Sequence, residues 1–326
     1  MIVRDWSTLS AAEIAPVYAA ERTRWLQNLQ WDSSAAWQEV EHARVTWGLP
    51  GFVAADDMGC LHGAAFYLPE DDRIDIGGIS SSHVLATDVL LDAVIRVAES
   101  SGVQTVRILA LDAAVALSSG LRVRGFEVEP HLYLSRSLSA PPPAPPRAGL
   151  LWKRAAERTL AGHPVLTSVE TWHADDVEAA ASLLARAYDR QTGRLFAPRH
   201  EAGEWQRYVR NLVTHVGCGT VNPAHSLVVR DGGELRAVAL VTDIAPGAAH
   251  LVQLAVDPSL RGSKVGAALV HRVCATLQQA DYRALTLMVA GTNAAARALY
   301  DHAGFRHDAT FLSGTLSLAD RKHAAA

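Results

Sequence analysis

Two stretches of this chain repeat the same order of residues, and this repeat constrains the possible fold more than any other feature. At an offset of 179 residues, Gly125-Phe126 corresponds to Gly304-Phe305. Three apolar positions with the spacing of a helix face coincide at the same offset: Ala86, Leu90 and Val94 with Val265, Leu269 and Val273. Agreement in order and spacing indicates a duplicated unit.

The hydrophobic periodicity predicts the elements of each half. In the second half they are a strand over 250–256, a helix over 264–279, a strand over 284–290, a short helix over 293–302 and a closing strand over 305–316. The upstream helices are expected over 11–25, 35–47, 174–190 and 201–213, and pairs of strands over 51–56 and 60–67 and over 226–230 and 234–243. Strands that alternate with helices predict an α/β (α+β) fold, and the consecutive strands predict a mixed, largely antiparallel sheet in each half.

A proline-rich segment divides the chain near its middle. Residues 140–149 include five prolines in six consecutive positions. Proline is excluded from helix interiors and central strands, so this segment favours a stiff, extended spacer. We therefore expect a first domain over 1–139, a linker over 140–149 and a second domain over 150–326.

Composition narrows the class of protein. Apolar residues make up 49% and charged residues 20% of the 326 residues, as in a well-packed soluble protein. The start lacks the apolar core of a signal peptide, and no apolar stretch approaches the ~20 residues that span a bilayer, so we expect a cytoplasmic protein with no membrane partner. The richness in alanine and the preference for arginine over lysine indicate a bacterial genome of high GC content.

Cysteine usage and charge exclude further classes. Cys60, Cys218 and Cys274 form no CxxC pair, so neither a disulfide framework nor a metal site is expected. Residues 151–326 carry a net charge of only +3, which argues against a nucleic-acid partner. We expect a monomer or a homodimer.

The segment 254–269 combines a strand, a turn and the start of a helix. The apolar strand ends at Asp257-Pro258, and small residues lead into an amphipathic helix. Backbone N–H groups at a helix N-terminus bind phosphate, and glycine lets a ligand approach the backbone closely. Arg261 and Lys264 add charge-assisted contacts to phosphate oxygens. The turn alone is also compatible with an ordinary strand–helix connection.

Together with a second motif, this segment resembles the GNAT superfamily of acyl-CoA N-acyltransferases. The pyrophosphate loop of that superfamily reads [RQ]-x-x-G-x-[GA] after a strand ending in Ala-Val-x-Pro, and Arg261 and Gly266 match it. Lys264 departs from it, because it stands where the family has its first glycine. The run 293–305 matches the downstream pattern N-x-x-A-x-x-[LF]-Y-x-x-x-G-F. The resemblance covers about 166–318 and implies two tandem GNAT-like domains, each with a sheet flanked by helices.

The resemblance implies that acetyl-CoA or another short acyl-CoA is the co-substrate. Backbone groups of the strand would pair with the pantetheine amides, the loop would hold the pyrophosphate, and Asn293 would anchor the short helix or contact the cofactor. The cofactor-binding residues expected on this basis are Leu254, Ala255, Val256, Arg261, Gly262, Ser263, Lys264, Val265, Gly266, Ala267 and Asn293.

Two residues are the expected catalytic groups. The resemblance places Tyr300 near the sulfur, where a phenol of pKa ~10 can protonate a departing thiolate of pKa ~8.5 while the proton moves in concert with bond cleavage. Many relatives have a glutamate seven residues before the position of Asp257, and this chain has His250 there. The imidazole could take the proton of the amine directly or through water, or His250 could mark a strand edge, with Asp243 as the second candidate base. Tandem members of the superfamily include mycothiol synthases, and the missing glutamate argues against that activity.

The first half has lost the residues of the cofactor motifs. At the offset of 179, the positions of Arg261, Gly262, Gly266, Asn293 and Tyr300 are occupied by Ser82, His83, Thr87, Ala114 and Leu121. We therefore expect a degenerate GNAT-like domain that supports the second one. The alternative is that the run 77–82 still offers N–H and hydroxyl donors to an acyl-CoA.

The leading hypothesis is an acyltransferase, more narrowly an N-acetyltransferase that transfers acetyl directly to a small-molecule amine in a ternary complex. The alternatives are a non-catalytic acyl-CoA sensor and a GNAT domain that performs O-acylation or thioester decarboxylation. The resemblance places the acceptor near 188–208, a segment that includes Arg190, Arg194, Phe196, His200 and Trp205.

Overall fold

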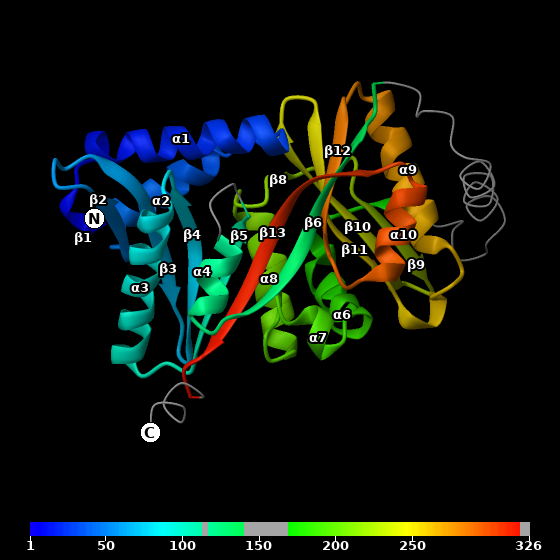
Figure 1. Cartoon of the computed structure of the whole chain (residues 1–326). Helices are drawn as coiled ribbons and strands as arrows, with labels where there is room; N and C mark the ends of the chain where they lie inside the picture. The colour runs from blue at the N-terminus through cyan, green and yellow to red at the C-terminus, as the bar shows by residue number, and fades with distance from the viewer. Residues whose placement is uncertain (113–116, 140–168, 320–326) are drawn as a thin grey trace. The chain divides into compact units, whose positions relative to one another are not determined.

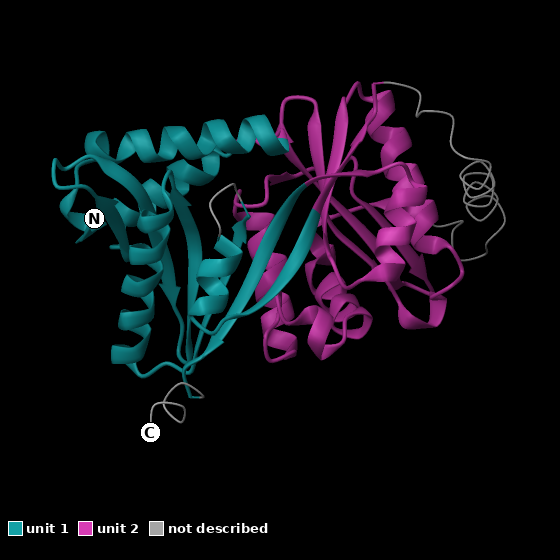
Figure 2. Ribbon diagram, in the orientation of Figure 1, with its two compact units in different colours: residues 1–29, 33–132, 309–326 teal, residues 30–32, 133–308 magenta. Residues whose placement is uncertain are grey.

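The computed structural model describes residues 1–112, 117–139 and 169–319, and the predicted linker 140–149 lies outside them. These residues form two compact units, coloured separately in Figure 2. Of the described residues, the first unit contains those within the ranges Met1–Leu29, Ser33–Leu132 and Ala309–Ala326, and the second contains those within Gln30–Asp32 and Tyr133–Asp308. Within the described ranges, no helix has both the length and the apolar character needed to cross a membrane.

The elements up to residue 139 follow the predicted order, as labelled in Figure 1. The strands are β1 (Ile2–Asp5), β2 (Gly51–Ala55), β3 (Leu61–Pro69), β4 (Arg73–Ser81), β5 (Thr105–Leu111) and β6 (Glu127–Ser137). The helices are α1 (Ala11–Leu29), α2 (Ser34–Thr46), α3 (Val84–Ser101) and α4 (Leu117–Val123).

The elements from residue 169 onward repeat this order. The strands are β7 (Val169–Thr171), β8 (Thr220–Val221), β9 (Leu227–Asp231), β10 (Glu234–Ala245), β11 (Ala248–Val256), β12 (Ala284–Ala290) and β13 (Arg306–Ser317). The helices are α6 (Val177–Ala187), α7 (Arg190–Gly193), α8 (Ala202–Thr214), α9 (Val265–Gln279) and α10 (Ala294–His302). The single helix predicted over 174–190 is therefore divided, because the chain is extended at Tyr188 and Asp189.

The first unit is built on a sheet in the order β1-β2-β3-β4-β5-β13-β6. The pairs β1–β2, β2–β3, β3–β4 and β5–β13 are antiparallel, whereas β4 and β5 are parallel. Helix α3 packs against β2, β3 and β4, and its apolar face supplies Leu91, Val94 and Ile95 to the core. A second apolar cluster forms around the fully buried Trp6, between α1 and the strands β2 and β3.

The second unit has a sheet in the order β6-β12-β11-β10-β9-β7, with β8 paired to β10. Here the parallel pair is β11 and β12, and β10 is antiparallel to both β11 and β9. Helices α6 and α8 bury Leu183, Leu184 and Trp205 against β10 and β11. Both units therefore confirm the predicted fold class of a mixed, largely antiparallel sheet flanked by helices.

The repeated Gly-Phe pair has the same structural role in both halves. Gly125 and Gly304 end α4 and α10 in the left-handed conformation, with φ of 85° and 88°. The N–H of the phenylalanine that follows donates back to the carbonyl of Leu121 in one half and of Tyr300 in the other. Glycine is favoured there because a side chain is strained at positive φ.

The closing strands differ from the predicted arrangement. β13 pairs antiparallel with β5, from Phe311 opposite Leu111 to Ser317 opposite Thr105, so the last strand of the sequence completes the sheet of the first unit. Residues 133–137 of β6, from the first half, belong to the second unit beside β12 (Figure 1). The two units therefore differ from the predicted ranges 1–139 and 150–326 by an exchange of closing strands.

Candidate functional site

Two parallel strands of the second unit separate from each other where the cofactor motif begins. β11 and β12 are paired over only four residues each, from Ala248 opposite Ala284 to Leu251 opposite Leu287. β11 continues to Val256 and β12 to Ala290 without further pairing to each other. The side chains of Leu254 and Val256 are half-buried beside this opening. Backbone groups along one edge of 252–256 are thus available to an extended ligand.

A cluster of backbone donors lies directly beyond this opening. In the part of the chain that the structure describes, the N–H groups of five loop and first-turn residues have no partner: Gly262, Lys264, Val265, Gly266 and Ala267. The first intrahelical bond of α9 is donated by Ala268 to the carbonyl of Lys264. Unpaired N–H groups at a helix N-terminus attract an anion, and the helix macrodipole adds to that attraction.

Two residues of this loop show why glycine is typical of it. Lys264 has φ of 68°, the left-handed conformation that glycine adopts without strain, so the departure from the family motif is a strained residue in this structure. A Cβ on Gly266 would meet Val256 at 3.5 Å and Leu299 at 3.6 Å, which are ordinary contacts. The fold therefore accepts a methyl group at 266.

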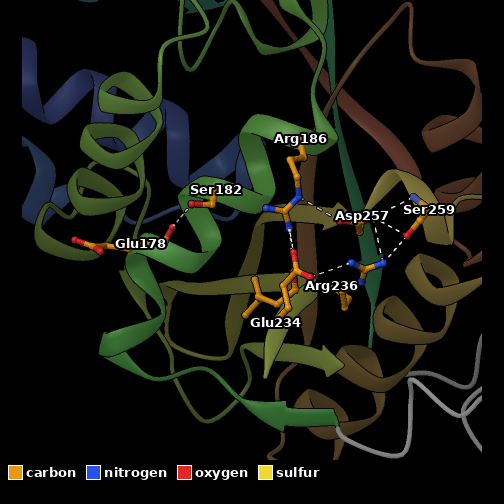
Figure 3. A network of polar contacts seen from close by, with 8 residues as sticks. Glu178, Ser182, Arg186, Glu234, Arg236, Asp257 and Ser259 are labelled. Atoms are coloured by element: carbon orange, nitrogen blue, oxygen red, sulfur yellow. Dashed lines mark hydrogen bonds and ion pairs between the residues drawn. The ribbon is translucent and has the colours of Figure 1, made fainter. Parts of the chain in front are cut away.

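Charged side chains fix the start of the loop to the end of α6 (Figure 3). Asp257 accepts hydrogen bonds from the N–H and hydroxyl of Ser259 at 3.0 and 2.7 Å, and from Arg186 at 3.3 Å. Burial by itself would raise the pKa of Asp257, but these hydrogen bonds and the charge of Arg236 hold it below its ordinary value. Arg261 donates to the carbonyl of Ala187 at 2.6 Å.

Asn293 and Tyr300 lie at the two ends of α10. The side-chain oxygen of Asn293 caps the helix by accepting from the N–H of Ala296 at 3.1 Å, so this residue anchors the helix as expected. Tyr300 is buried, and its ring packs edge-on against Phe305 at 5.7 Å. Burial, followed by the interaction with Tyr188, raises the pKa of Tyr300. Its phenol therefore keeps its proton at neutral pH.

His250 lies in surroundings that do not suit its predicted role as general base. It is 6% exposed, between the rings of Trp31 at 5.0 Å and Tyr133 at 5.8 Å. Its Nδ1 is 2.8 Å from the hydroxyl oxygen of Thr286. Burial lowers the pKa of His250 to about 3, because the charged imidazolium is poorly solvated there. A group with this pKa holds a transferred proton weakly near neutral pH. The burial of His250 therefore argues against its predicted role as general base.

The carboxylate of the second candidate base already accepts hydrogen bonds from neighbouring side chains. Asp243 accepts from the hydroxyl of Tyr282 at 2.7 Å and from the side-chain amide of Asn222 at 3.0 Å. Burial, and then the hydrogen bond to Asp243, raises the pKa of Tyr282 to about 12. These hydrogen bonds form a polar cluster that links β10 to the residue directly after β8 and to the segment that precedes β12.

Gln253 is a site residue that the sequence analysis missed. It is 3% exposed and lies on β11, two residues beyond Leu251, where the pairing with β12 ends. Its side-chain oxygen accepts from Tyr188 at 3.0 Å, and its nitrogen donates to Tyr208 at 2.5 Å. A glutamine inside the apolar run Leu-Val-Gln-Leu-Ala-Val was the available signal, since a buried amide needs partners.

The predicted acceptor segment 188–208 contains both buried aromatic residues and more accessible polar residues. Phe196 and Trp205 pack with the rings of Tyr188 and Tyr208 in one aromatic cluster, and Trp205 is fully buried in the core. Arg190 is exposed, whereas Arg194 and His200 are half-buried. In the described residues, no group of three or more side chains is arranged to hold a metal ion.

The first unit keeps the strand opening but not the donors. β4 and β5 are also paired over only four residues each, ending at Ile76 opposite Ile108. At the start of α3, however, the N–H groups of Ala86 and Thr87 donate to the carbonyl of His83, and that of Leu85 donates to the ring of His83. The N–H of Ser82 donates to His62. These groups are already satisfied, unlike those of the second unit.

The fold is similar to that of solved GNAT proteins. The structure matches the GCN5-related N-acetyltransferase from Sphaerobacter thermophilus with a TM-score of 0.64 and 16% identity, covering 97% of this chain and 95% of that one. It also matches a tandem GNAT protein from the clavulanic acid biosynthesis pathway with a TM-score of 0.52 and 15% identity, covering 82% of both chains.

The sequence gives a second comparison. Residues 184–305 match the model of the Acetyltransferase (GNAT) family. Over 114 residues the chain is 33% identical to the mycothiol acetyltransferase of Beutenbergia cavernae. That match covers 34% of this chain and 38% of the relative, so the chain is aligned with well under half of that protein.

Proposed function

We propose that this protein is an N-acetyltransferase that moves the acetyl group of acetyl-CoA directly to the amine of a small molecule in a ternary complex. The observation that carries the proposal is the set of five N–H groups at the start of α9 that have no partner among the described residues, directly beyond the point where β11 and β12 separate. An open strand edge followed by a helix N-terminus suits a ligand with a chain of amides that ends in a pyrophosphate.

In this proposal each part of the second unit holds one part of the donor. The edge of Leu254, Ala255 and Val256 pairs with the pantetheine arm, and the N–H groups of Gly262 and of residues 264–267 bind the pyrophosphate. The exposed side chain of Lys264 adds positive charge there. Arg261, which is bound to the carbonyl of Ala187, ties the loop to α6. The donor supplies an activated acetyl group on sulfur.

Tyr300 is the proposed general acid. Burial raises the pKa of Tyr300, so its phenol is protonated at neutral pH and donates its proton in concert with cleavage of the C–S bond, not to a free thiolate. No hydrogen bond of its hydroxyl is found within the described ranges. We propose that the proton of the amine leaves to water and not to His250, in keeping with the pKa of about 3 that burial gives this imidazole. Asn293 contributes by holding the N-terminus of α10, the helix that carries Tyr300.

The acceptor is proposed as a small amine. The mycothiol acetyltransferase match covers only 38% of that relative, and this chain has His250 where many family members have a glutamate. We therefore take the acceptor class from the residues of this chain and not from the name of the relative. The first unit is proposed as the degenerate partner, because its helix donors are already bonded.

Release of free thiol from acetyl-CoA across a panel of amines tests this function. Tyr300→Phe should lower kcat by roughly 10²–10⁴-fold, the usual contribution of general acid catalysis, with little change in acetyl-CoA affinity. The phenylalanine ring still fills the site beside Phe305, so the melting temperature should hardly change. Near-normal turnover of this variant above pH 8 would assign the acid role to another group. Binding of acetyl-CoA without release of free thiol in the presence of any amine would favour the alternative of a non-catalytic acyl-CoA sensor.

A further inference from the structure

A short segment of the first half of the sequence lies inside the second unit. Gln30–Asp32 follow α1 and belong to the unit that carries the cofactor loop (Figure 2). The N–H of Asp32 donates to the carbonyl of Ile244, at the end of β10, at 2.8 Å. Gln30 has φ of 55°, a conformation that a residue with a side chain rarely adopts. This turn brings Trp31 against His250, and strain of this kind is concentrated at functional positions.

Three rings form a buried wall at this place. Trp31, Tyr133 and His250 are 6%, 1% and 6% exposed. Trp31 and His250 are 5.0 Å apart, Tyr133 and His250 are stacked at 5.8 Å, and Trp31 and Tyr133 are 6.5 Å apart. Two of the three rings come from the first half of the sequence, and the third comes from β11. We call this set the ring wall.

The register of β11 puts the ring wall next to the point where the strands separate. His250 pairs with Thr242 and Gln253 with Leu240, and the extra residue between them forms a bulge. Thr242 and Leu240 are two residues apart on β10 and lie on one face, so His250 and Gln253 also share a face. The pairing of β11 with β12 ends at Leu251, directly after His250. The ring wall therefore lies beside the strand opening, on the face that carries Gln253, Tyr188 and Tyr208.

We propose that the ring wall is the acceptor-side boundary of the reaction centre, and that Trp31 determines acceptor specificity and keeps water from the thioester. This inference rests on the proposed function, in which the acetyl group lies where the strands separate. Two aromatic rings and a neutral imidazole attract apolar and aromatic groups and offer no cation to a carboxylate. The acceptor class is accordingly a non-acidic amine on an aromatic or aliphatic body, such as 2-phenylethylamine.

The test compares two tryptophans in the full-length protein. Trp31→Ala opens the ring wall, and Trp37→Ala is the matched control, because Trp37 stacks on Tyr18 within the first unit at 4.7 Å. Without any amine, water can add to the thioester carbonyl carbon, the C–S bond breaks, and acetate and free thiol are released. We expect Trp31→Ala to speed this hydrolysis by about 10-fold or more, because excluded water regains access to the site. The control should behave like the wild type.

Acceptor selectivity gives a second readout. The wild type should favour 2-phenylethylamine over glutamate by roughly 10–100-fold in kcat/KM, and Trp31→Ala should lose most of this ratio. The affinity for acetyl-CoA should stay within about two-fold, since the pyrophosphate donors of α9 are untouched. Trp31→Phe keeps a ring and should retain most of both properties, which covers the case in which the alanine variant fails to fold.

The outcomes separate this inference from the proposed function. A wild type that binds no acetyl-CoA would overturn the proposed function and this inference with it. Normal donor binding with the same hydrolysis and selectivity in Trp31→Ala and Trp37→Ala would overturn the inference alone. A loss of acetyl-CoA affinity in parallel with activity would make Trp31 a structural residue of the donor site, and a wild-type preference for glutamate would exclude the stated acceptor class.

Discussion

At the scale of single residues, Lys264 is the clearest departure from its family motif. Its φ of 68° destabilises a residue that has a side chain by about 1–2 kcal/mol. Glycine avoids this strain, but it loses more backbone entropy on folding, which offsets part of the gain. Lys264→Gly should therefore raise the free energy of unfolding by about 0.5–1 kcal/mol in urea denaturation. Lys264→Ala removes the same charge but keeps the strain, and it should show no gain. Equal stability of the two variants would mean that the loop is not strained at this position.

His250 links folding stability to pH. Its pKa is about 3 in the folded protein and ~6.5 in an unfolded chain, so the unfolded state binds more protons between these values. The contribution of His250 to the free energy of unfolding is fully present above pH ~6.5. It falls by up to about 1.4 kcal/mol per pH unit as the pH drops toward 3. His250→Phe should make urea midpoints less dependent on pH over this range, whereas His42→Gln, at an exposed site, should not. Identical pH slopes in all three proteins would contradict the burial of a neutral His250.

The contrast between Tyr300 and His250 shows how far single residues could be predicted. The run 293–305 is contiguous, so its residues predict the helix, the capping role of Asn293 and the place of Tyr300 on that helix. The surroundings of His250 come from residues 31 and 133, which are far away in the sequence. Periodicity marks such a residue as part of a strand but does not say which distant rings cover it.

At the scale of elements, the sequence predicts strands better than it predicts their partners. The closing strands β6 and β13 have apolar patterns that suit either half, because both follow the repeated Gly-Phe pair. The gapless repeat suggests that each strand closes its own half, whereas β13 pairs with β5. The opening between β11 and β12 likewise depends on strand pairing, and no single residue of either strand predicts it. Only the resemblance to a family implied a free strand edge, through the expected pairing of this strand with the pantetheine amides.

The exchange of closing strands makes a prediction about fragments. Residues 150–326 alone lack 133–137 of β6 and the segment 30–32, both of which belong to the second unit. The partner of β13 in the first unit, β5, is missing as well. We expect this fragment to be aggregated or inactive, and co-expression with residues 1–139 to restore solubility and thiol release. A soluble, fully active fragment would show that the exchanged strands are dispensable.

At the scale of the whole molecule, two units with similar sheets differ in the N–H donors that their helix N-termini offer. The first unit bonds its N–H groups to His83, and the second leaves five of them free within the described residues. A duplicated fold can thus keep its sheet and its strand opening while losing the donors that bind an anion. The account therefore predicts one donor site in each chain.

Calorimetric titration of the full-length protein with acetyl-CoA tests this central claim most directly. We predict one acetyl-CoA per chain, retained by Gly266→Ala, whose Cβ has ordinary contacts of 3.5 Å or more. Gly266→Trp should abolish binding, because its bulk enters the space beside the strand edge and the loop. Melting curves should show that both variants are folded. Two molecules bound per chain, no binding at all, or unchanged binding by a folded Gly266→Trp would contradict the account.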